Sequence, residues 1–344
     1  MKFYNKFFIP GIGILSDNKI NSLIFLNETS DTYWKSGKNG VHCIFCLRDK
    51  KAEFVVFENK TICIVKSEMG YPAIYTLKEV FFDPPPIAVL MDLDGTSVHS
   101  ENFWIWIIEK TIAKLLQKRS FSLSQDDLPY VSGHSVSEHL QYCITKYCQS
   151  VSIEKARKYY YEIASVEMKK ILQGKGKQCA FLPSPYLKEF LLSLKSKKIK
   201  IGLVTSGIYE KAWPEITSAF KKIGIDNPLY FYDSIITGGY PVKAGQVGTL
   251  GELCPKPHPW LYAEIARIGL GITPSQCNKV IGIEDSGAGI LSLRLAGFPT
   301  IGLQGGNITQ AGADIFCNFK AKNLEDALKI ILGKSQSNFT NELK

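Results

Sequence analysis

Two carboxylates lie two residues apart in the segment Asp92–Thr96, whose sequence is Asp-Leu-Asp-Gly-Thr. The segment directly follows Ile87–Met91, a short apolar run that is typical of a buried parallel strand. Two acidic side chains on nearby paths would allow one to attack phosphorus while the other manages protons, provided that their environments differ. Gly95 would permit a sharp turn. The spacing alone leaves open the alternative that the aspartates only cap the next helix.

A second apolar run ends in hydroxyl groups and a glycine. Thr205, Ser206 and Gly207 follow Ile201–Val204. The Thr205 hydroxyl and the backbone N–H groups after it could hold phosphate oxygens. The alternative is ordinary turn chemistry, because Ser or Thr followed by Gly is common after a strand.

A third segment presents a cation. Lys256 stands between Pro255 and Pro257, which predicts a fixed and extended loop. A fixed ammonium group can offset the negative charge of a carboxylate and of a phosphate. The alternative is a solvated lysine that precedes a helix.

A fourth segment presents adjacent carboxylates. Glu284 and Asp285 follow the apolar run Val280–Ile283. Hard oxygen ligands of this kind suit Mg²⁺, which takes one or two protein carboxylates together with waters and phosphate. The alternative is that Asp285 or Ser286 only caps the following helix.

The elements that must position these residues alternate between strand and helix patterns from residue 200 onward. The expected strands are Ile201–Val204, Tyr230–Ile236, Val280–Ile283 and Thr300–Leu303. The expected helices are Tyr209–Ile223, Pro259–Ile268, Ala288–Ala296 and Asn323–Leu332. Such alternation predicts an α/β fold with a doubly wound parallel sheet. Ligands bind at the carboxyl ends of strands in such a sheet, so the four segments are expected to lie together.

The rest of the chain predicts further domains. Residues 99–198 are almost wholly helical in pattern, with helices expected at Phe103–Lys118, Val136–Cys148, Ile153–Leu172 and Pro185–Lys197. They interrupt a core formed by residues 87–98 and 199–333. Residues 1–82 form a β-rich region, with strands expected at Leu23–Leu26, Val41–Leu47, Ala52–Phe57, Thr61–Val65 and Ala73–Leu77. Residues 334–344 are expected to be a loose tail.

Composition narrows the classes of partner. The chain has 344 residues, of which 45% are hydrophobic, and a formal charge of +9, which favours anionic substrates. Nucleic acid is not expected as a partner, because no dense basic block with interleaved aromatics is present. No membrane partner is expected, since no run approaches the ~20 apolar residues of a spanning helix. Nine scattered cysteines predict free thiols and a cytoplasmic location.

Each of the four segments is a modest signal, but their order and their positions after expected strands are specific together. With these residues the sequence resembles the haloacid dehalogenase superfamily of phosphohydrolases, and most of all its branch of phosphoglycolate phosphatase and β-phosphoglucomutase. The resemblance covers roughly residues 87–330. The four motifs of the family match, in order, Asp92-Leu93-Asp94-Gly95-Thr96, Thr205, Lys256 and Glu284-Asp285.

The resemblance implies a role for each acidic residue. Asp92 would attack phosphorus and form an aspartyl-phosphate, while Asp94 would protonate the leaving alcohol and then activate water. Mg²⁺ would be held by Asp92, the Asp94 backbone carbonyl and Asp285, with Glu284 assisting. Dehalogenases of the family lack the second Asp and P-type ATPases carry Thr there, so Asp94 argues for a phosphatase or a mutase.

The resemblance also implies how substrate is held. Thr205, Ser206 and Gly207 would bind the phosphoryl group, and Lys256 would neutralise charge. The helical insertion matches the position of a mobile α-helical cap that excludes water and selects substrate. Candidate substrate contacts from this insertion are His99, Glu101, His134 and Ser135. For His134, a helix-capping or partly buried histidine is an equal alternative.

These features predict a Mg²⁺-dependent phosphatase that acts on a small phosphate monoester, for which sugar phosphates, phosphoglycolate and nucleotides all fit. One alternative is a phosphomutase of the β-phosphoglucomutase type. Another is a non-catalytic binding or regulatory protein whose working part is residues 1–82. That region and the long stretch 238–253 lie outside the pattern of the family. Residues 1–82 are left as an interaction module, an oligomerisation surface or a domain that reaches the site.

Overall fold

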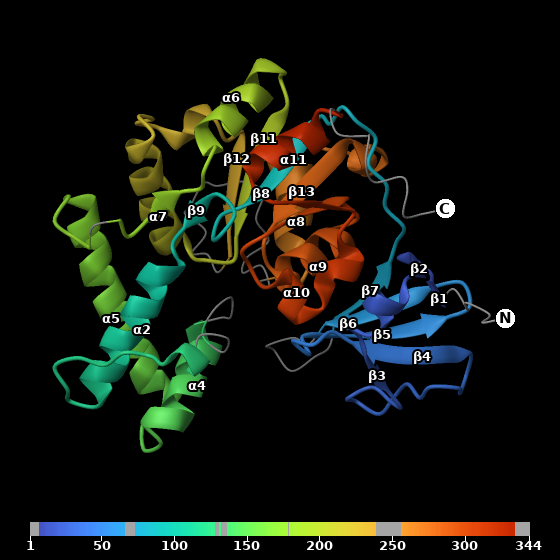
Figure 1. The fold of residues 1–344 in the computed structure, drawn as a ribbon, viewed down its shortest axis with the longest axis horizontal. Helices are drawn as coiled ribbons and strands as arrows, with labels where there is room; N and C mark the ends of the chain where they lie inside the picture. The colour runs from blue at the N-terminus through green and yellow to red at the C-terminus, as the bar shows by residue number, and fades with distance from the viewer. Residues whose placement is uncertain are drawn as a thin grey trace. The chain divides into compact units, whose positions relative to one another are not determined.

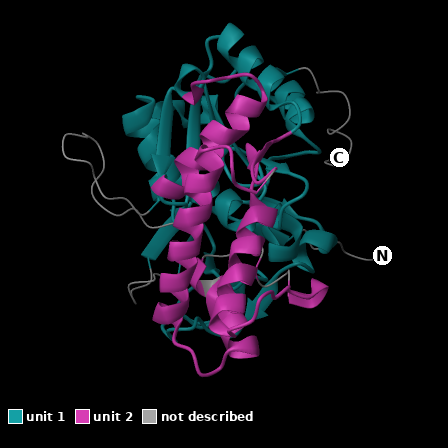
Figure 2. Cartoon of the chain, turned by 90° about the vertical axis from the view of Figure 1, so that its left-hand side faces the viewer, with its two compact units in different colours: residues 1–96, 185–209, 229–344 teal, residues 97–184, 210–228 magenta. Residues whose placement is uncertain are grey.

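The structure is a computed structural model that describes residues 7–65, 73–127, 131, 136–177, 179–238 and 256–333 (Figure 1). The chain divides into two compact units (Figure 2). The first unit comprises Met1–Thr96, Pro185–Tyr209 and Leu229–Lys344, and the second comprises Ser97–Ser184 and Glu210–Pro228. The domain limits expected from the sequence stay predictions. No helix among the described residues is long and apolar enough to cross a membrane.

A six-stranded parallel sheet forms the centre of the first unit, in the order β12-β11-β8-β13-β14-β15. The strands are β8 (Ala88–Asp92), β11 (Lys200–Thr205), β12 (Ser234–Thr237), β13 (Val280–Glu284), β14 (Thr300–Leu303) and β15 (Phe319–Ala321). Every residue of β8 and β13 is buried, which is why these strands read as continuous apolar runs. The predicted α/β fold is therefore confirmed.

The chain order places the first core strand in the middle of the sheet. β8 pairs in parallel with β11 on one side and with β13 on the other. From β8 the chain builds one side of the sheet with β11 and β12, and then builds the other side with β13, β14 and β15. The carboxyl end of β8 therefore lies at the point where the strand order reverses. Asp92, Thr205 and Glu284 each end one of these three adjacent strands. Three polar side chains thus lie side by side at the carboxyl edge of an otherwise apolar sheet.

Helices cover both faces of this sheet (Figure 1). They are α6 (Leu187–Ser196), α8 (Trp260–Glu264), α9 (Gly287–Ala296), α10 (Ile308–Ala311) and α11 (Leu324–Ile331). α6 contacts α11, and α8 contacts α9. On the side of α8 and α9, Leu261, Tyr262 and Leu293 pack into a buried cluster with Leu90 of β8 and Val204 of β11. This cluster fixes α8 and α9 against the parallel sheet.

One expected strand was wrong over half of its length. Pro228–Tyr230 forms a 3-10 turn, and β12 begins only at Ser234. Asp233 explains the late start, because its carboxylate accepts a hydrogen bond from the backbone N–H of Ile201 at 2.8 Å. Its own N–H donates to the Ile201 carbonyl. A side-chain bond of this kind satisfies a backbone N–H at the start of β11, before β11 pairs with β12.

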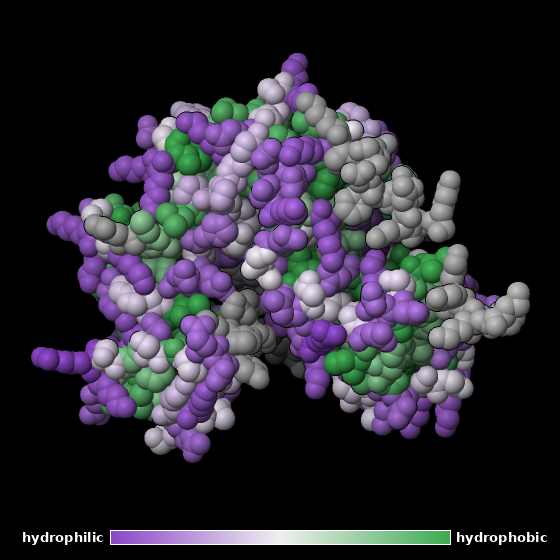
Figure 3. Space-filling model, viewed as in Figure 1, coloured by the Kyte–Doolittle hydropathy of each residue, from purple (hydrophilic) through white to green (hydrophobic). Residues whose placement is uncertain are grey.

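The N-terminal region of the first unit is an antiparallel sheet in the order β3-β4-β5-β6-β7. Its strands are β3 (Ile24–Leu26), β4 (Val41–Cys46), β5 (Ala52–Phe57), β6 (Thr61–Val65) and β7 (Ala73–Leu77), which confirms all five expected strands. A hairpin of β1 (Phe7–Ile9) and β2 (Gly13–Leu15) and a single helical turn α1 (Asp17–Ile20) precede it. Figure 3 shows mostly polar surface, with apolar residues gathered over this region.

This N-terminal sheet shares a hydrophobic core with the parallel-sheet region. Phe45 stacks on Phe54 with ring centroids 4.7 Å apart, and Phe54 lies 5.2 Å from Phe316. Ile290 and Leu291 of α9 belong to the same buried cluster. Each fully buried side chain of this size contributes about 1.5–3 kcal/mol. The sheet is therefore built into the first unit and is anchored against α9.

The second unit is helical. It contains α2 (Glu101–Leu115), α4 (Val136–Tyr147), α5 (Ile153–Leu172) and most of α7 (Tyr209–Lys222). The expected helix Ile153–Leu172 has the observed bounds, and the Ser152 side chain caps it by accepting from the Lys155 N–H. Two short strands that the sequence did not predict, β9 (Val98–His99) and β10 (Leu182–Pro183), pair where the chain enters and leaves the unit.

A buried carboxylate, Asp127, joins several segments in the interior of this helical unit by hydrogen bonds. Asp127 is fully buried and accepts hydrogen bonds from Ser124, Tyr142, Lys146 and Tyr147. Burial alone would raise the pKa of Asp127, but the bonds from Lys146 and the two tyrosines hold its pKa well below the usual range. A buried charge with this many donors fixes the C-terminal half of α4 relative to the loop that precedes the helix.

Candidate active site

The four sequence segments meet at the carboxyl edge of the parallel sheet. Asp92 ends β8 and is only 5% exposed. Lys256 Nζ donates a hydrogen bond to Asp92 Oδ1 and another, at 2.6 Å, to Glu284 Oε1. Asp94 Oδ2 accepts from Thr205 Oγ1 at 3.2 Å. Polar residues from four distant segments thus meet at this edge, in one group around Lys256 and a second pair formed by Asp94 and Thr205.

The loop after β11 supports this network through its hydroxyl groups. The Gly207 N–H donates to Thr205 Oγ1 at 2.9 Å, which fixes the rotamer that reaches Asp94. Ser206 Oγ accepts from the Lys256 N–H at 3.2 Å. The structure therefore uses the Ser206 hydroxyl to hold the lysine loop. Phosphate binding by the Ser206 and Gly207 backbone stays a prediction.

Glu284 is fully buried and accepts four hydrogen bonds. Its Oε1 accepts from Lys256 Nζ and from Tyr262 OH, each at 2.6 Å. Its Oε2 accepts from the Ser286 N–H at 3.3 Å and the Ser286 hydroxyl at 3.0 Å. A buried carboxylate is stable only when its oxygens are satisfied in this way. Glu284 is therefore a fixed anchor for the ammonium group of Lys256.

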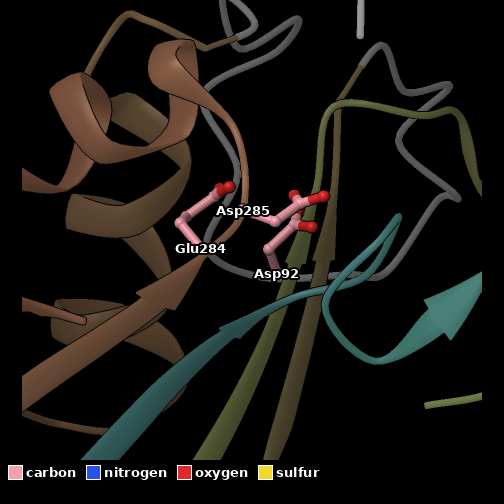
Figure 4. A group of neighbouring side chains, drawn as sticks. All are labelled: Asp92, Glu284 and Asp285. Atoms are coloured by element: carbon pink, nitrogen blue, oxygen red, sulfur yellow. The ribbon is translucent and has the colours of Figure 1, made fainter. Parts of the chain in front are cut away.

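Asp92, Glu284 and Asp285 place carboxylate oxygens within 4.8 Å of one another (Figure 4). Asp92 comes from the end of β8, and the other two come from the end of β13. Burial and repulsion from Glu284 raise the pKa of Asp92 well above its usual value, although the Lys256 ammonium opposes them. The same causes raise the pKa of Asp285. Three acidic groups at this spacing create an environment that favours a cation.

Two glycines lie against this acidic cluster at positions where a side chain would not fit. Gly95 has a φ of +85°, and a Cβ there would lie 2.0 Å from Asp285 Oδ2. A Cβ at Gly289 would lie 1.9 Å from the Glu284 carboxylate. Clustered hard oxygen donors are the ligands that Mg²⁺ prefers. The residues present therefore fit a divalent cation.

Some functional contacts have no signal in the sequence. Tyr262 falls on an apolar helix pattern and reads as a packing residue, yet its buried hydroxyl donates to Glu284. Ser286 reads as a helix cap, and its hydroxyl accepts from the Gly289 N–H while it also donates to Glu284. Such partners are set by tertiary packing across the sheet edge.

The predicted substrate contacts belong to other parts of the chain. His99 lies in β9 of the second unit, with Nε2 3.4 Å from Ser184 Oγ, and burial lowers its pKa. Glu101 begins α2 in the same unit. His134 and Ser135 lie outside the described residues, as does nearly all of the stretch 238–253. The substrate-binding roles of these residues stay predictions.

Comparison with known folds agrees with this architecture. A predicted phosphoglycolate phosphatase from Haemophilus somnus 129PT has a TM-score of 0.55 at 18% identity, with 72% of this chain and 98% of that chain covered. A HAD hydrolase of family IA, variant 3, from Entamoeba histolytica has a TM-score of 0.52 at 19% identity, with 71% of this chain and 98% of that chain covered. CbbY from Rhodobacter sphaeroides, in complex with phosphate, has a TM-score of 0.50 at 16% identity, with 70% of this chain and 95% of that chain covered. These likenesses show a shared fold.

A sequence search of curated proteins found no significant match. A family model described as haloacid dehalogenase-like hydrolase matches residues 88–297, which is more than half of the chain. The matched range begins in β8 and includes Asp92, Thr205, Lys256 and Glu284. The resemblance inferred from the four motifs is thereby confirmed. The chain belongs to the family of haloacid dehalogenase-like hydrolases.

Proposed function

We propose that this hydrolase cleaves a small phosphate monoester with Mg²⁺ and that Asp92 is its nucleophile. The observation that carries the proposal is the buried network in which Lys256 bridges Asp92 and Glu284 beside Asp285. A carboxylate at the end of a strand, charge-paired and next to an acidic cation site, is suited to attack on phosphorus. The formal charge of +9 favours anionic substrates.

The reaction follows from the positions of two carboxylates. An Asp92 oxygen forms a bond to phosphorus as the bond between phosphorus and the leaving oxygen breaks, and Asp94 donates a proton to that oxygen. Asp94 then takes a proton from water, which attacks phosphorus and releases inorganic phosphate from Asp92. The Thr205 hydroxyl, 3.2 Å from Asp94 Oδ2, holds Asp94 for both proton transfers.

The cation would be held by carboxylate oxygens of Asp92 and Asp285. Glu284 is assigned a supporting role, because both of its oxygens already accept hydrogen bonds. When bound, Mg²⁺ supplies positive charge and orients the phosphate oxygens. Phosphate is bound by the CbbY protein of similar fold, which supports phosphate recognition by this architecture.

Gly95→Ala is expected to weaken Mg²⁺ binding by at least about tenfold and to lower activity with it. The added Cβ meets the Asp285 carboxylate, and the left-handed backbone costs about 1–2 kcal/mol of stability for a non-glycine residue. Gly174→Ala is the matched control, since Gly174 has a φ of +72° with nothing within 4 Å. Calorimetric Mg²⁺ titration of both variants checks this. Equal Mg²⁺ affinity in the two variants would contradict the assignment of Asp285.

A panel of phosphate esters tests the proposed function itself. The purified protein is incubated with Mg²⁺ and with sugar phosphates, phosphoglycolate and nucleotides, and both inorganic phosphate and isomeric sugar phosphates are measured. Release of inorganic phosphate in step with substrate loss is the expected result. An isomeric phosphate as the main product would assign a phosphomutase instead. No turnover of any ester would favour a non-catalytic binding role.

A further inference from the structure

The loop that carries Lys256 is fixed at several points within the first unit. The Lys256 N–H donates to Ser206 Oγ at 3.2 Å, and its Nζ is bound by Asp92 and Glu284. Two residues further on, the His258 carbonyl accepts a hydrogen bond of 2.5 Å from Ser292 Oγ of α9. These contacts hold the backbone on both sides of Pro257.

The side chain of His258 is held by a different part of the chain. His258 is 4% exposed, and its Nδ1 lies 2.9 Å from the hydroxyl of Tyr75. The two rings meet edge to face, with centroids 6.0 Å apart and planes at 72°. Trp260 Nε1 donates to the same Tyr75 oxygen at 3.0 Å. Because an indole N–H can only donate, the Tyr75 proton can be directed at His258 Nδ1.

Tyr75 comes from the N-terminal sheet. It lies on β7 opposite Cys63 of β6, and its side chain packs against the cluster that joins this sheet to α9. α9 also donates from Arg294 Nη2 to the Gly11 carbonyl at 2.7 Å. Gly11 lies in the hairpin between β1 and β2, and α9 also contacts β7 itself. The helix that holds the His258 backbone therefore packs against the strand that carries Tyr75. A strand within a packed sheet is a rigid support for such a contact.

We infer that the N-terminal sheet positions the catalytic lysine, and that Tyr75 is the positioning residue that acts through His258. The inference rests on the proposed function of Lys256. Loss of the Tyr75 hydroxyl leaves a buried histidine nitrogen without this partner, two residues from Lys256. The lysine loop then samples positions in which Nζ is withdrawn from Asp92. Residues 1–82 would accordingly be part of the working enzyme rather than a separate module.

Tyr75→Phe is expected to lower kcat/KM about 3- to 10-fold, the range that corresponds to one hydrogen bond. Tyr33→Phe is the matched control, because Tyr33 is 74% exposed in the same region, and it should retain wild-type activity. The variants are compared in the wild-type and Lys256→Ala backgrounds. A residue that acts only through Lys256 has no further effect once Lys256 is absent.

The outcomes separate this inference from the proposed function. Lys256→Ala with wild-type turnover would refute the role of Lys256, whatever Tyr75→Phe does. A large loss in Lys256→Ala, with equal effects of Tyr75→Phe in both backgrounds, would overturn only the positioning role. Amide hydrogen exchange of the peptide 256–264 gives a readout that needs no activity. Faster exchange in Tyr75→Phe than in Tyr33→Phe supports the inference, and equal exchange contradicts it.

Discussion

Replacing Asp92 by Asn is expected to lower kcat by at least about 10⁴-fold, because an amide of the same shape cannot attack phosphorus. The variant keeps an oxygen that accepts from Lys256, so the surrounding network retains its geometry. The loss therefore reports on the nucleophile rather than on the fold. Steady-state assays with the best ester of the substrate panel measure it. Turnover within tenfold of wild type would exclude Asp92 as the nucleophile.

The same Asp-to-Asn substitution at a surface position is the control for this variant. Asp83 is 44% exposed at its side chain and pairs with Lys279 at 2.7 Å, so Asp83→Asn should cost less than about 1 kcal/mol and leave kcat unchanged. Rapid quenching of the wild-type reaction should trap a phosphorylated peptide that contains Asp92. The same peptide from Asp92→Asn should carry no phosphate.

The stability of Asp92→Asn gives an independent check of the acidic cluster. A carboxyl whose pKa is raised on folding stabilises the protein most at low pH and loses that contribution as pH rises through its folded-state pKa. Asp92 is such a group, because burial and Glu284 disfavour its charge. Without added metal at neutral pH, Asp92→Asn is therefore expected to melt no lower than wild type. A marked drop in Tm would show that Asp92 has a structural role.

Removal of the divalent cation is expected to abolish turnover, and added Mg²⁺ is expected to restore it. Burial and repulsion from Glu284 raise the pKa of Asp285, so a cation bound among the oxygens of Asp92, Glu284 and Asp285 would offset their charge. Binding of Mg²⁺ to the folded state should then raise Tm, with about 2.7 kcal/mol gained at a concentration 100-fold above Kd. A chelator series followed by both activity and Tm measures this.

Asp285→Asn separates cation binding from general damage. This variant should lose the Mg²⁺-dependent rise in Tm and should lower kcat/KM by at least roughly 10²-fold, since even residues that only hydrogen-bond to a metal ligand are worth about 10–100-fold. Asp83→Asn should show the wild-type rise in Tm. Chelator-resistant turnover in the wild type, or a normal Mg²⁺ response in Asp285→Asn, would refute the proposed cation site.

Local pattern determined most of the parallel-sheet region. The apolar runs Ile87–Met91 and Val280–Ile283 predicted the strands β8 and β13, because buried parallel strands are apolar on both faces. The helix Ile153–Leu172 was predictable to the residue from its helical spacing, and the structure adds the Ser152 cap at its start. Asp92 was found as a catalytic candidate because it directly follows a predictable strand. Lys256 was found because it stands in a loop that two prolines restrict.

The tertiary structure alone decided which distant side chains meet. Nothing near Tyr262 or Tyr75 in the sequence indicates that one hydroxyl serves Glu284 and the other lies against His258. These partners are 22 and 183 residues apart. Local pattern encodes backbone preference and burial, whereas the partner of a buried polar atom depends on how whole elements pack. The grouping of Asp92 with Lys256 and Glu284 could be predicted from sequence, whereas the contact of Tyr75 with His258 could not.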